Sequence, residues 1–162
     1  MPVPEKSENI ASMPLMKQWM LSEEKLPVTH LVIDHDVSCG QIRAVDRAYV
    51  TVLRQKMRLT QFTGARSSVL CWKNEGIASS SFIPLIDDRN VVIGGQHSTV
   101  ATQEELAEWD YEKDEPPETF THVYAIILRR STPITVRLLL AGIHQDRQQE
   151  VHATRLSDVG NL

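Results

Sequence analysis

The longest hydrophobic stretch of the chain spans residues 120–143 and reads FTHVYAIILRRSTPITVRLLLAGI. Two apolar runs flank a polar break at residues 129–133. The first run is mostly β-branched or aromatic, and the second opens with the β-branched residues Ile134, Thr135 and Val136, a composition typical of strands. We therefore predict a buried pair of strands, against which the rest of the core packs.

The second run also fits a helix. Thr132-Pro133 is a helix-start pattern, because proline is tolerated at the first helical position. Val136, Leu139 and Ile143 then fall on one helical face. A strand over residues 133–144 is our preferred prediction, and a helix is the alternative.

Length and composition indicate one domain. At 162 residues and 41% hydrophobic content, the chain can bury a core without disulfides or metal. Cys39 and Cys71 match no zinc or redox spacing. We predict that they are ordinary small apolar residues in a reducing compartment, and a disulfide between them is the alternative. We expect a flexible arm at 1–14, one globular domain at 15–144 and a polar tail at 145–162.

Targeting and membrane segments are not expected. The first residues lack a basic segment followed by an apolar run, so they do not resemble a signal or transit peptide. Arg129, Arg130 and Arg137 interrupt the best candidate for a membrane span. The expected location is therefore cytoplasmic, with no membrane-spanning segment.

The remaining elements are short. We predict a helix near residues 15–20, a helix at 42–57 with its basic residues facing solvent, and a helix starting at Thr102 with Glu105 completing a capping box. Strands are expected at 29–37, 67–73, 77–86 and 91–93, and a loop at 112–118. The predicted fold class is α+β: a β-rich single domain of about six short, mainly antiparallel strands with one or two helices.

Charge is distributed unevenly, although the net charge is only −4 and the pI is near 5.8. Residues 104–118 are mostly acidic. A basic stretch interleaved with Tyr49 and Phe62 has a composition that can contact phosphates and stack on bases. Its cations are Arg43, Arg47, Arg54, Lys56, Arg58 and Arg66. This pattern favours either a nucleic-acid partner or docking onto an oppositely charged copy of the same chain.

A metal site is a second candidate. On a strand, His30, Asp34 and Asp36 would share one face, and His97 could join them as a further ligand. The phrase Asp34-His35-Asp36 resembles the strand-end Asp-His-His motif of one phosphoesterase superfamily. The match covers only a few residues, with Asp36 in place of the second histidine, so it assigns no family.

A glycine loop at residues 94–99 (GGQHST) follows a predicted strand and could present backbone amides to a phosphate. It lacks the lysine of a P-loop and the GxGxxG spacing, so a plain loop is the alternative. Near the N-terminus, Met16, Trp19 and Met20 recur at helical spacing, which is typical of a core-facing helix or, if exposed, of a contact site.

No coherent catalytic set and no cofactor motif emerge from these patterns. The function expected first is a non-enzymatic interaction or assembly protein that forms a homo-oligomer, such as a structural or accessory protein of a virus or mobile element. The alternatives are a nucleic-acid-binding accessory protein using the basic stretch and a metal-dependent hydrolase built on His30, Asp34 and Asp36.

Overall fold

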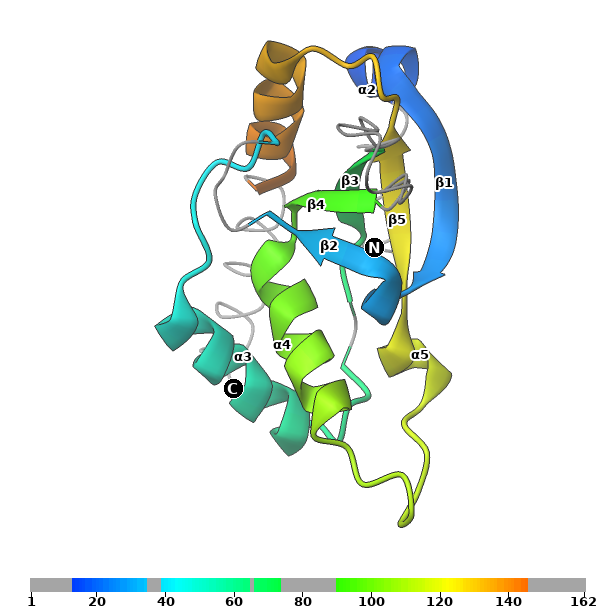
Figure 1. The fold of residues 1–162 in the computed structure, drawn as a ribbon, viewed down its shortest axis with the longest axis vertical. Coiled ribbons are helices and arrows are strands. Elements are labelled where there is room, and N and C mark those ends of the chain that lie inside the picture. The colour runs from blue at the N-terminus through cyan, green and yellow to red at the C-terminus, as the bar shows by residue number, and fades with distance from the viewer. Residues whose placement is uncertain (1–12, 35–38, 65, 74–89, 146–162) are drawn as a thin grey trace, which may run out of the picture.

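The computed structural model describes residues 13–34, 39–64, 66–73 and 90–145 (Figure 1). Its strands are β1 (Met20–Pro27), β2 (Leu31–Ile33), β3 (Val69–Lys73), β4 (Asn90–Gly94) and β5 (His122–Leu128). Its helices are α2 (Pro14–Trp19), the 3-10 helix η1 (Val28–His30), α3 (Arg47–Leu59), α4 (Gln96–Ala107), α5 (Glu118–Thr121) and a further helix at residues 134–145.

The five strands form one mixed sheet in the order β1-β5-β3-β4-β2. β1 and β5 pair antiparallel, as do β3 and β4, whereas β5 with β3 and β4 with β2 pair parallel. The expected combination of helices and strands is thus confirmed. The finer expectation of about six mainly antiparallel strands is only roughly matched, since the described residues hold five strands and five α-helices.

The prediction of a strand pair is correct for the first apolar run and wrong for the second, at residues 133–144. β5 forms where the first apolar run predicts a strand, but its neighbours are β1 and β3, so both of its edges are already hydrogen-bonded. The second run has no place beside β5 and forms the helix at residues 134–145 instead.

Local contacts explain how that helix begins. Thr132 Oγ1 donates to the carbonyl of Arg129 at 2.6 Å, and the amide of Arg137 donates to the carbonyl of Pro133 at 3.0 Å. The Arg137 guanidinium then lies 3.9 Å from the ring centroid of Trp72 on β3, a cation–π contact that ties the helix to the sheet.

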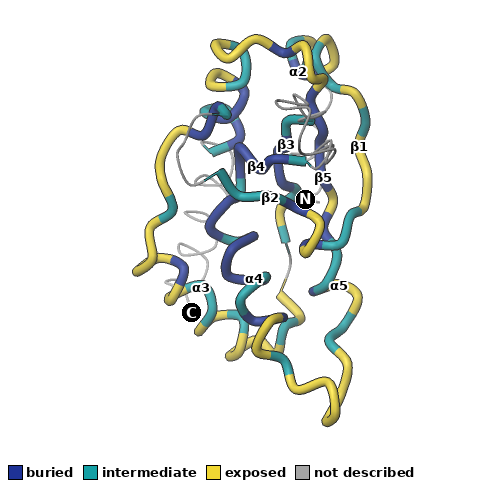
Figure 2. Tube along the Cα trace, viewed as in Figure 1, coloured by how far each residue is buried: buried dark blue, intermediate teal, exposed yellow. Residues whose placement is uncertain are grey.

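Successive residues of a strand point to opposite faces of the sheet, and both faces bury apolar side chains here. One face packs against α2 and the helix at 134–145. The buried residues of this layer, from the strands and the two helices together, are Met16, Leu70, Ile93, Ile126, Leu128, Leu140 and Ala141. The other face holds Val28, Leu31, Val69, Cys71, Val92, Val123, Ala125 and Ile127. Figure 2 shows the resulting contrast between the buried inner strands and the largely exposed β1.

β1 was not expected from the sequence, because its centre reads Ser-Glu-Glu-Lys and shows no apolar alternation. As the outermost strand it needs a partner on one side only, and charged residues are compatible with an exposed edge. The predicted strand at 29–37 is largely replaced by η1 and the short β2, with residues 35–38 outside the described part.

Two other predicted elements change their bounds. α3 begins at Arg47 rather than at residue 42, since Asp46 caps it by accepting from the amides of Ala48 and Tyr49. α4 begins at Gln96, so Thr102 lies inside the helix rather than at its cap, and its hydroxyl donates to the carbonyl of Ser98 at 2.8 Å. The predicted strand at 77–86 and most of both predicted terminal segments lie outside the described residues.

Within the described ranges, no helix has the length and apolar character needed to cross a membrane. Cys71 is buried in the core, Cys39 is half-buried, and no disulfide joins the two. Burial raises the pKa of the Cys71 thiol, which therefore stays protonated and unreactive.

Gly94 provides a test of the packing between β4 and the helix at 134–145. A Cβ placed on Gly94 would lie 2.6 Å from Nδ1 of His144, a side chain with only 2% exposure. We expect Gly94→Ala to lower the free energy of unfolding by about 1–3 kcal/mol, measured by urea denaturation. Gly142→Ala is the control, because its Cβ would meet only Ile42 Cδ1 at 3.8 Å and alanine favours a helix by about 0.5–1 kcal/mol. Equal effects at the two positions would contradict this packing.

Candidate functional site

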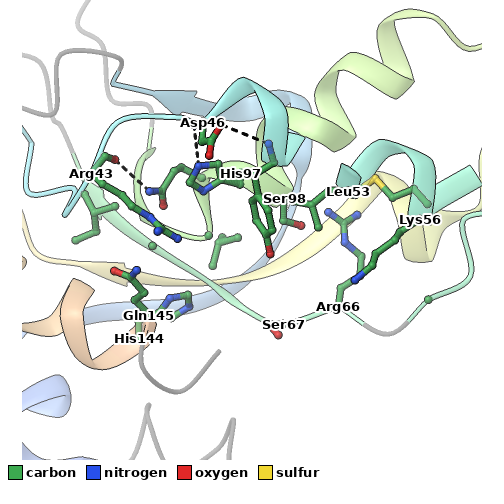
Figure 3. A pocket seen from close by; sticks show the side chains of 18 of the residues that line it. Arg43, Asp46, Leu53, Lys56, Arg66, Ser67, His97, Ser98, His144 and Gln145 are labelled. Carbon is green, nitrogen blue, oxygen red and sulfur yellow. Dashed lines mark hydrogen bonds between the residues drawn. The ribbon is translucent and has the colours of Figure 1, made fainter. Parts of the chain in front are cut away.

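A pocket of about 600 Å³ opens between α3, the end of β4, the start of α4 and the end of the helix at 134–145 (Figure 3). This volume is typical of a small-molecule site. We call it the α3–α4 pocket. The residues with polar or charged side chains that line it include Arg43, Asp46, Tyr49, Lys56, Arg66, Gln96, His97, Ser98, His144 and Gln145.

One face of α3 forms a wall of the pocket. Tyr49, Leu53, Lys56 and Thr60 recur at three- and four-residue spacing and all line it. The adjacent face carries Val50, which is fully buried against α4. Leu53 lies between the two faces, since it lines the pocket and also packs against the apolar cluster around Val50.

The start of α4 forms the opposite side. Gly95 has φ = 92°, a left-handed conformation that glycine adopts at little cost, and it directs the chain from β4 into the helix. The first intrahelical bond runs from the amide of Thr99 to the carbonyl of Gly95 at 3.1 Å. The amides of the first turn therefore have no intrahelical acceptor, and this turn lines the pocket.

Two hydrogen bonds fasten the segment before α3 to the start of α4. Nε2 of His97 accepts from the amide of Asp46 at 2.9 Å, which places the imidazole proton on Nδ1. Nε2 of Gln96 donates to the carbonyl of Arg43 at 3.3 Å. The Tyr49 ring packs edge-on against His97, with centroids 5.2 Å apart. The two sides of the pocket are therefore joined directly.

His144 supplies a buried polar wall. Its Nε2–H donates to the carbonyl of Ser68 at 2.7 Å, so the helix at 134–145 is tied to the residue before β3. Burial lowers the pKa of His144, partly offset by this hydrogen bond. Burial also lowers the pKa of His97, and the charge of Arg43 acts in the same direction while Asp46 opposes it. Both imidazoles are therefore neutral near neutral pH.

Three of the predicted nucleic-acid-binding cations form ion pairs with glutamates of α4. Arg47 donates to both carboxylate oxygens of Glu104 at 2.6 and 3.0 Å. Arg54 reaches the carboxylates of Glu104, Glu105 and Glu108. Arg58 pairs with Glu105 at 2.8 Å and with Glu108 at 3.6 Å. The expectation that the basic residues of the helix largely occupy its solvent side is met in part: the side chains of Arg47 and Arg58 are 62% and 56% exposed, whereas that of Arg54 is 17% exposed. All three still pair with glutamates of α4, so the basic and acidic stretches meet within one chain.

The other three cations line the pocket. Arg43, Lys56 and Arg66 form no ion pair with a carboxylate among the described residues. Arg66 donates instead to Phe120 O and Thr102 Oγ1, and burial lowers its pKa to about 10, which leaves it charged at neutral pH. The sequence pattern alone could not divide the six cations, because the division depends on where α4 lies.

The predicted metal ligands do not assemble in the described part of the chain. His30 is exposed at the end of η1, Asp34 Oδ2 accepts from the amide of Cys39 at 2.8 Å, and Nε2 of His97 already accepts from Asp46. No group of three His, Cys, Asp or Glu residues is placed to hold a metal ion in these ranges. Asp36 lies outside them.

The predicted contact residues of the first helix lie in or against the core. Met16 has no exposed surface, and Trp19 and Met20 pack half-buried against the same apolar cluster. Sequence reasoning missed Gln96, Ser98 and His144 as pocket residues. The glycine loop was the available signal for the first two, whereas nothing in the local sequence indicates that His144 reaches this site.

Comparison with known proteins adds no further assignment: no protein-family model and no curated protein matches the sequence.

Glu105 tests the contact between α3 and α4. Its side chain is 6% exposed and accepts from both Arg54 and Arg58. We expect Glu105→Gln to lower the free energy of unfolding by about 1–3 kcal/mol, because charged hydrogen bonds are lost in a partly buried site. Glu108→Gln is the matched control: with 61% side-chain exposure it should cost less than about 1 kcal/mol. Chemical denaturation of both variants measures the difference, and a larger loss in Glu108→Gln would contradict the assignment.

The two neutral histidines predict a pH dependence of stability. Because the pKa values of His97 and His144 are lowered in the folded state, the unfolded chain binds protons first as the pH falls. Stability should therefore decrease from about pH 6.5 downward, through the lower pKa values of the folded protein. Denaturation curves recorded across this range measure the slope. His97→Gln should flatten this slope, and an unchanged slope in His97→Gln would oppose the assignment.

Proposed function

We propose that the protein is a binding protein for phosphate-bearing ligands and that the ligand occupies the α3–α4 pocket. The observation that carries the proposal is the division of the basic stretch. Arg47, Arg54 and Arg58 are neutralised by glutamates. The other three cations of the stretch, Arg43, Lys56 and Arg66, line the pocket and form no ion pair with a carboxylate in the part of the chain that the structure describes.

Electrostatics supports an anionic ligand. Among the described residues, three cations line the pocket against a single carboxylate, that of Asp46, which already accepts from the amides of Ala48 and Tyr49. The first turn of α4, at the positive end of the helix dipole, lines the same space. These groups favour a phosphate, which presents several acceptor oxygens and carries charge at neutral pH.

The opposite wall supports an organic group attached to the phosphate. Leu53, Met57 and Phe62 line the pocket, and Phe62 packs edge-on against Trp109 at a centroid distance of 4.7 Å. A pocket with an apolar wall and a few convergent polar groups is typical of small-molecule sites. No chemical step is proposed, because His97 already serves as an acceptor for Asp46.

Self-association and assembly, expected first from the sequence, stay a prediction. The ion pairs between α3 and α4 occupy three arginines and three glutamates of the two stretches that were expected to attract a second copy. Within one chain, these pairs already use part of the charge that an electrostatic oligomer would need. Metal-dependent hydrolysis also stays a prediction, without support from a metal-binding group in the described ranges.

Calorimetric titration tests the proposal with inorganic phosphate, pyrophosphate, a sugar phosphate and a nucleoside monophosphate as probes. We expect at least one phosphate compound to bind and to raise the melting temperature as its concentration increases. Arg43→Glu and Lys56→Glu should each weaken binding about tenfold or more, since each replaces an attraction by a repulsion worth over about 1.4 kcal/mol.

Lys17→Glu is the matched control. Lys17 is exposed near the end of α2 and does not line the pocket, yet its reversal changes the net charge by the same amount. Binding by Lys17→Glu should equal that of the unaltered protein. If no phosphate compound binds at millimolar concentration, or if all three reversals weaken binding equally, the pocket is not a phosphate site.

A further inference from the structure

We propose that the ligand is single-stranded nucleic acid and that the α3–α4 pocket holds a short segment of its backbone. This inference rests on the proposed function, because it requires the pocket to bind phosphate. The inference extends the proposed function by naming a ligand that carries several phosphates in a row rather than one.

The separation of the cations is the first argument. Arg43 lies before α3, whereas Lys56 lies late in the helix. The rise of the helix from Arg47 to Lys56 is about 13 Å. Figure 3 shows Arg43 at one end of the pocket and Lys56 with Arg66 at the other, with His97 and Ser98 between them. A single phosphate group is far smaller than this separation. A sugar–phosphate backbone repeats its charge and can engage both ends.

Aromatic rings between the charges are the second argument. Tyr49 lines the pocket with 41% of its surface exposed, and its edge-on contact with His97 holds the ring in place. Phe62 also lines the pocket, and its ring is braced by Trp109 and Phe120 at centroid distances of 4.7 and 4.9 Å. Rings held in this way provide platforms for unpaired bases, which stack without regard to sequence.

The backbone around Phe62 supports a fixed position for its ring. Gln61 and Phe62 have φ = 53° and 62°, a left-handed conformation that side chains other than glycine rarely adopt. Such strain is retained where surrounding contacts stabilise it, and it is concentrated at binding sites. Here it places an aromatic side chain in the pocket wall, next to the turn that leads to Arg66.

The charge of the site sets the expected strength of binding. In the described part of the chain, Arg43, Lys56 and Arg66 are the cations that line the pocket, and the chain as a whole carries a net charge of −4. Neutralisation of three phosphates on a single strand predicts a slope of about −2 in a plot of log K against log salt concentration. Binding should therefore be weaker and less salt-sensitive than that of a strongly basic nucleic-acid-binding protein.

Fluorescence anisotropy with labelled oligothymidylates and oligouridylates tests the inference, with the mononucleotides as unlabelled competitors. Affinity should rise from the dinucleotide to the tetranucleotide and octanucleotide, and the octanucleotide should bind at least about tenfold more tightly than the mononucleotide. Arg43→Gln and Lys56→Gln should each reduce the salt slope by about 0.7. Tyr49→Leu should weaken binding about fivefold or more with an unchanged salt slope, because it removes stacking rather than charge.

Matched controls come from the same helix and the same residue types. Arg58→Gln removes a cation of α3 that pairs with Glu105, so it should leave the salt slope unchanged in protein shown to be folded by circular dichroism. Tyr111→Leu removes an exposed tyrosine that does not line the pocket and should leave affinity unchanged.

The outcomes separate this inference from the proposed function. Equal affinity for mononucleotides and octanucleotides, with sensitivity to Lys56→Gln, would retain a phosphate site and overturn the nucleic-acid inference. Length-dependent binding that Arg43→Gln and Lys56→Gln leave unchanged would place nucleic acid elsewhere and overturn it as well. Absence of binding by every phosphate compound would overturn both.

Discussion

The pocket depends on the contact between α3 and α4, and that contact depends on Arg54. Its side chain is 17% exposed, and its guanidinium reaches three carboxylates on α4 in a partly buried setting, where charges attract more strongly than at the surface. Beneath it, Val50 packs against Val100 and Ala101. The apolar contact stabilises the helix pair by removing these side chains from water. The planar guanidinium sets the position of α3 along α4 through its fixed hydrogen-bond directions.

The same contact decides which charges remain available to a ligand. A helix that carries cations on two faces can pair the cations of one face with a neighbouring acidic helix and leave those of the other face unpaired. The glutamates of α4 neutralise Arg47, Arg54 and Arg58, and Arg47 lowers the pKa of Glu104 through their hydrogen bond. Lys56 lies on the other face of α3 and lines the pocket. Electrostatic selectivity at the pocket is therefore a consequence of helix packing.

Hydrogen bonds from backbone groups connect the pocket to the fold. Nε2 of His97 accepts a hydrogen bond from the amide of Asp46. The carboxylate of Asp46 in turn caps α3 by accepting from the amide of Ala48. On the far side, His144 ties the helix at 134–145 to the carbonyl before β3. Each neutral imidazole bridges two elements, so the walls of the pocket belong to one connected unit rather than to independent loops.

Local sequence determined several features of this protein: the strand β5 from its β-branched and aromatic run, the helix α3 with its alternating faces, and the glycine break before α4. These features follow from preferences within a few residues along the chain. Only the tertiary structure decided that residues 134–145 form a helix, that the charged β1 becomes an edge strand, and which basic residues line the pocket. The reason is that each outcome depends on residues distant in sequence: the strands that already flank β5, the sheet edge that accepts β1, and the glutamates of α4 that pair with some of the arginines. Local preferences do not encode the positions of these partners.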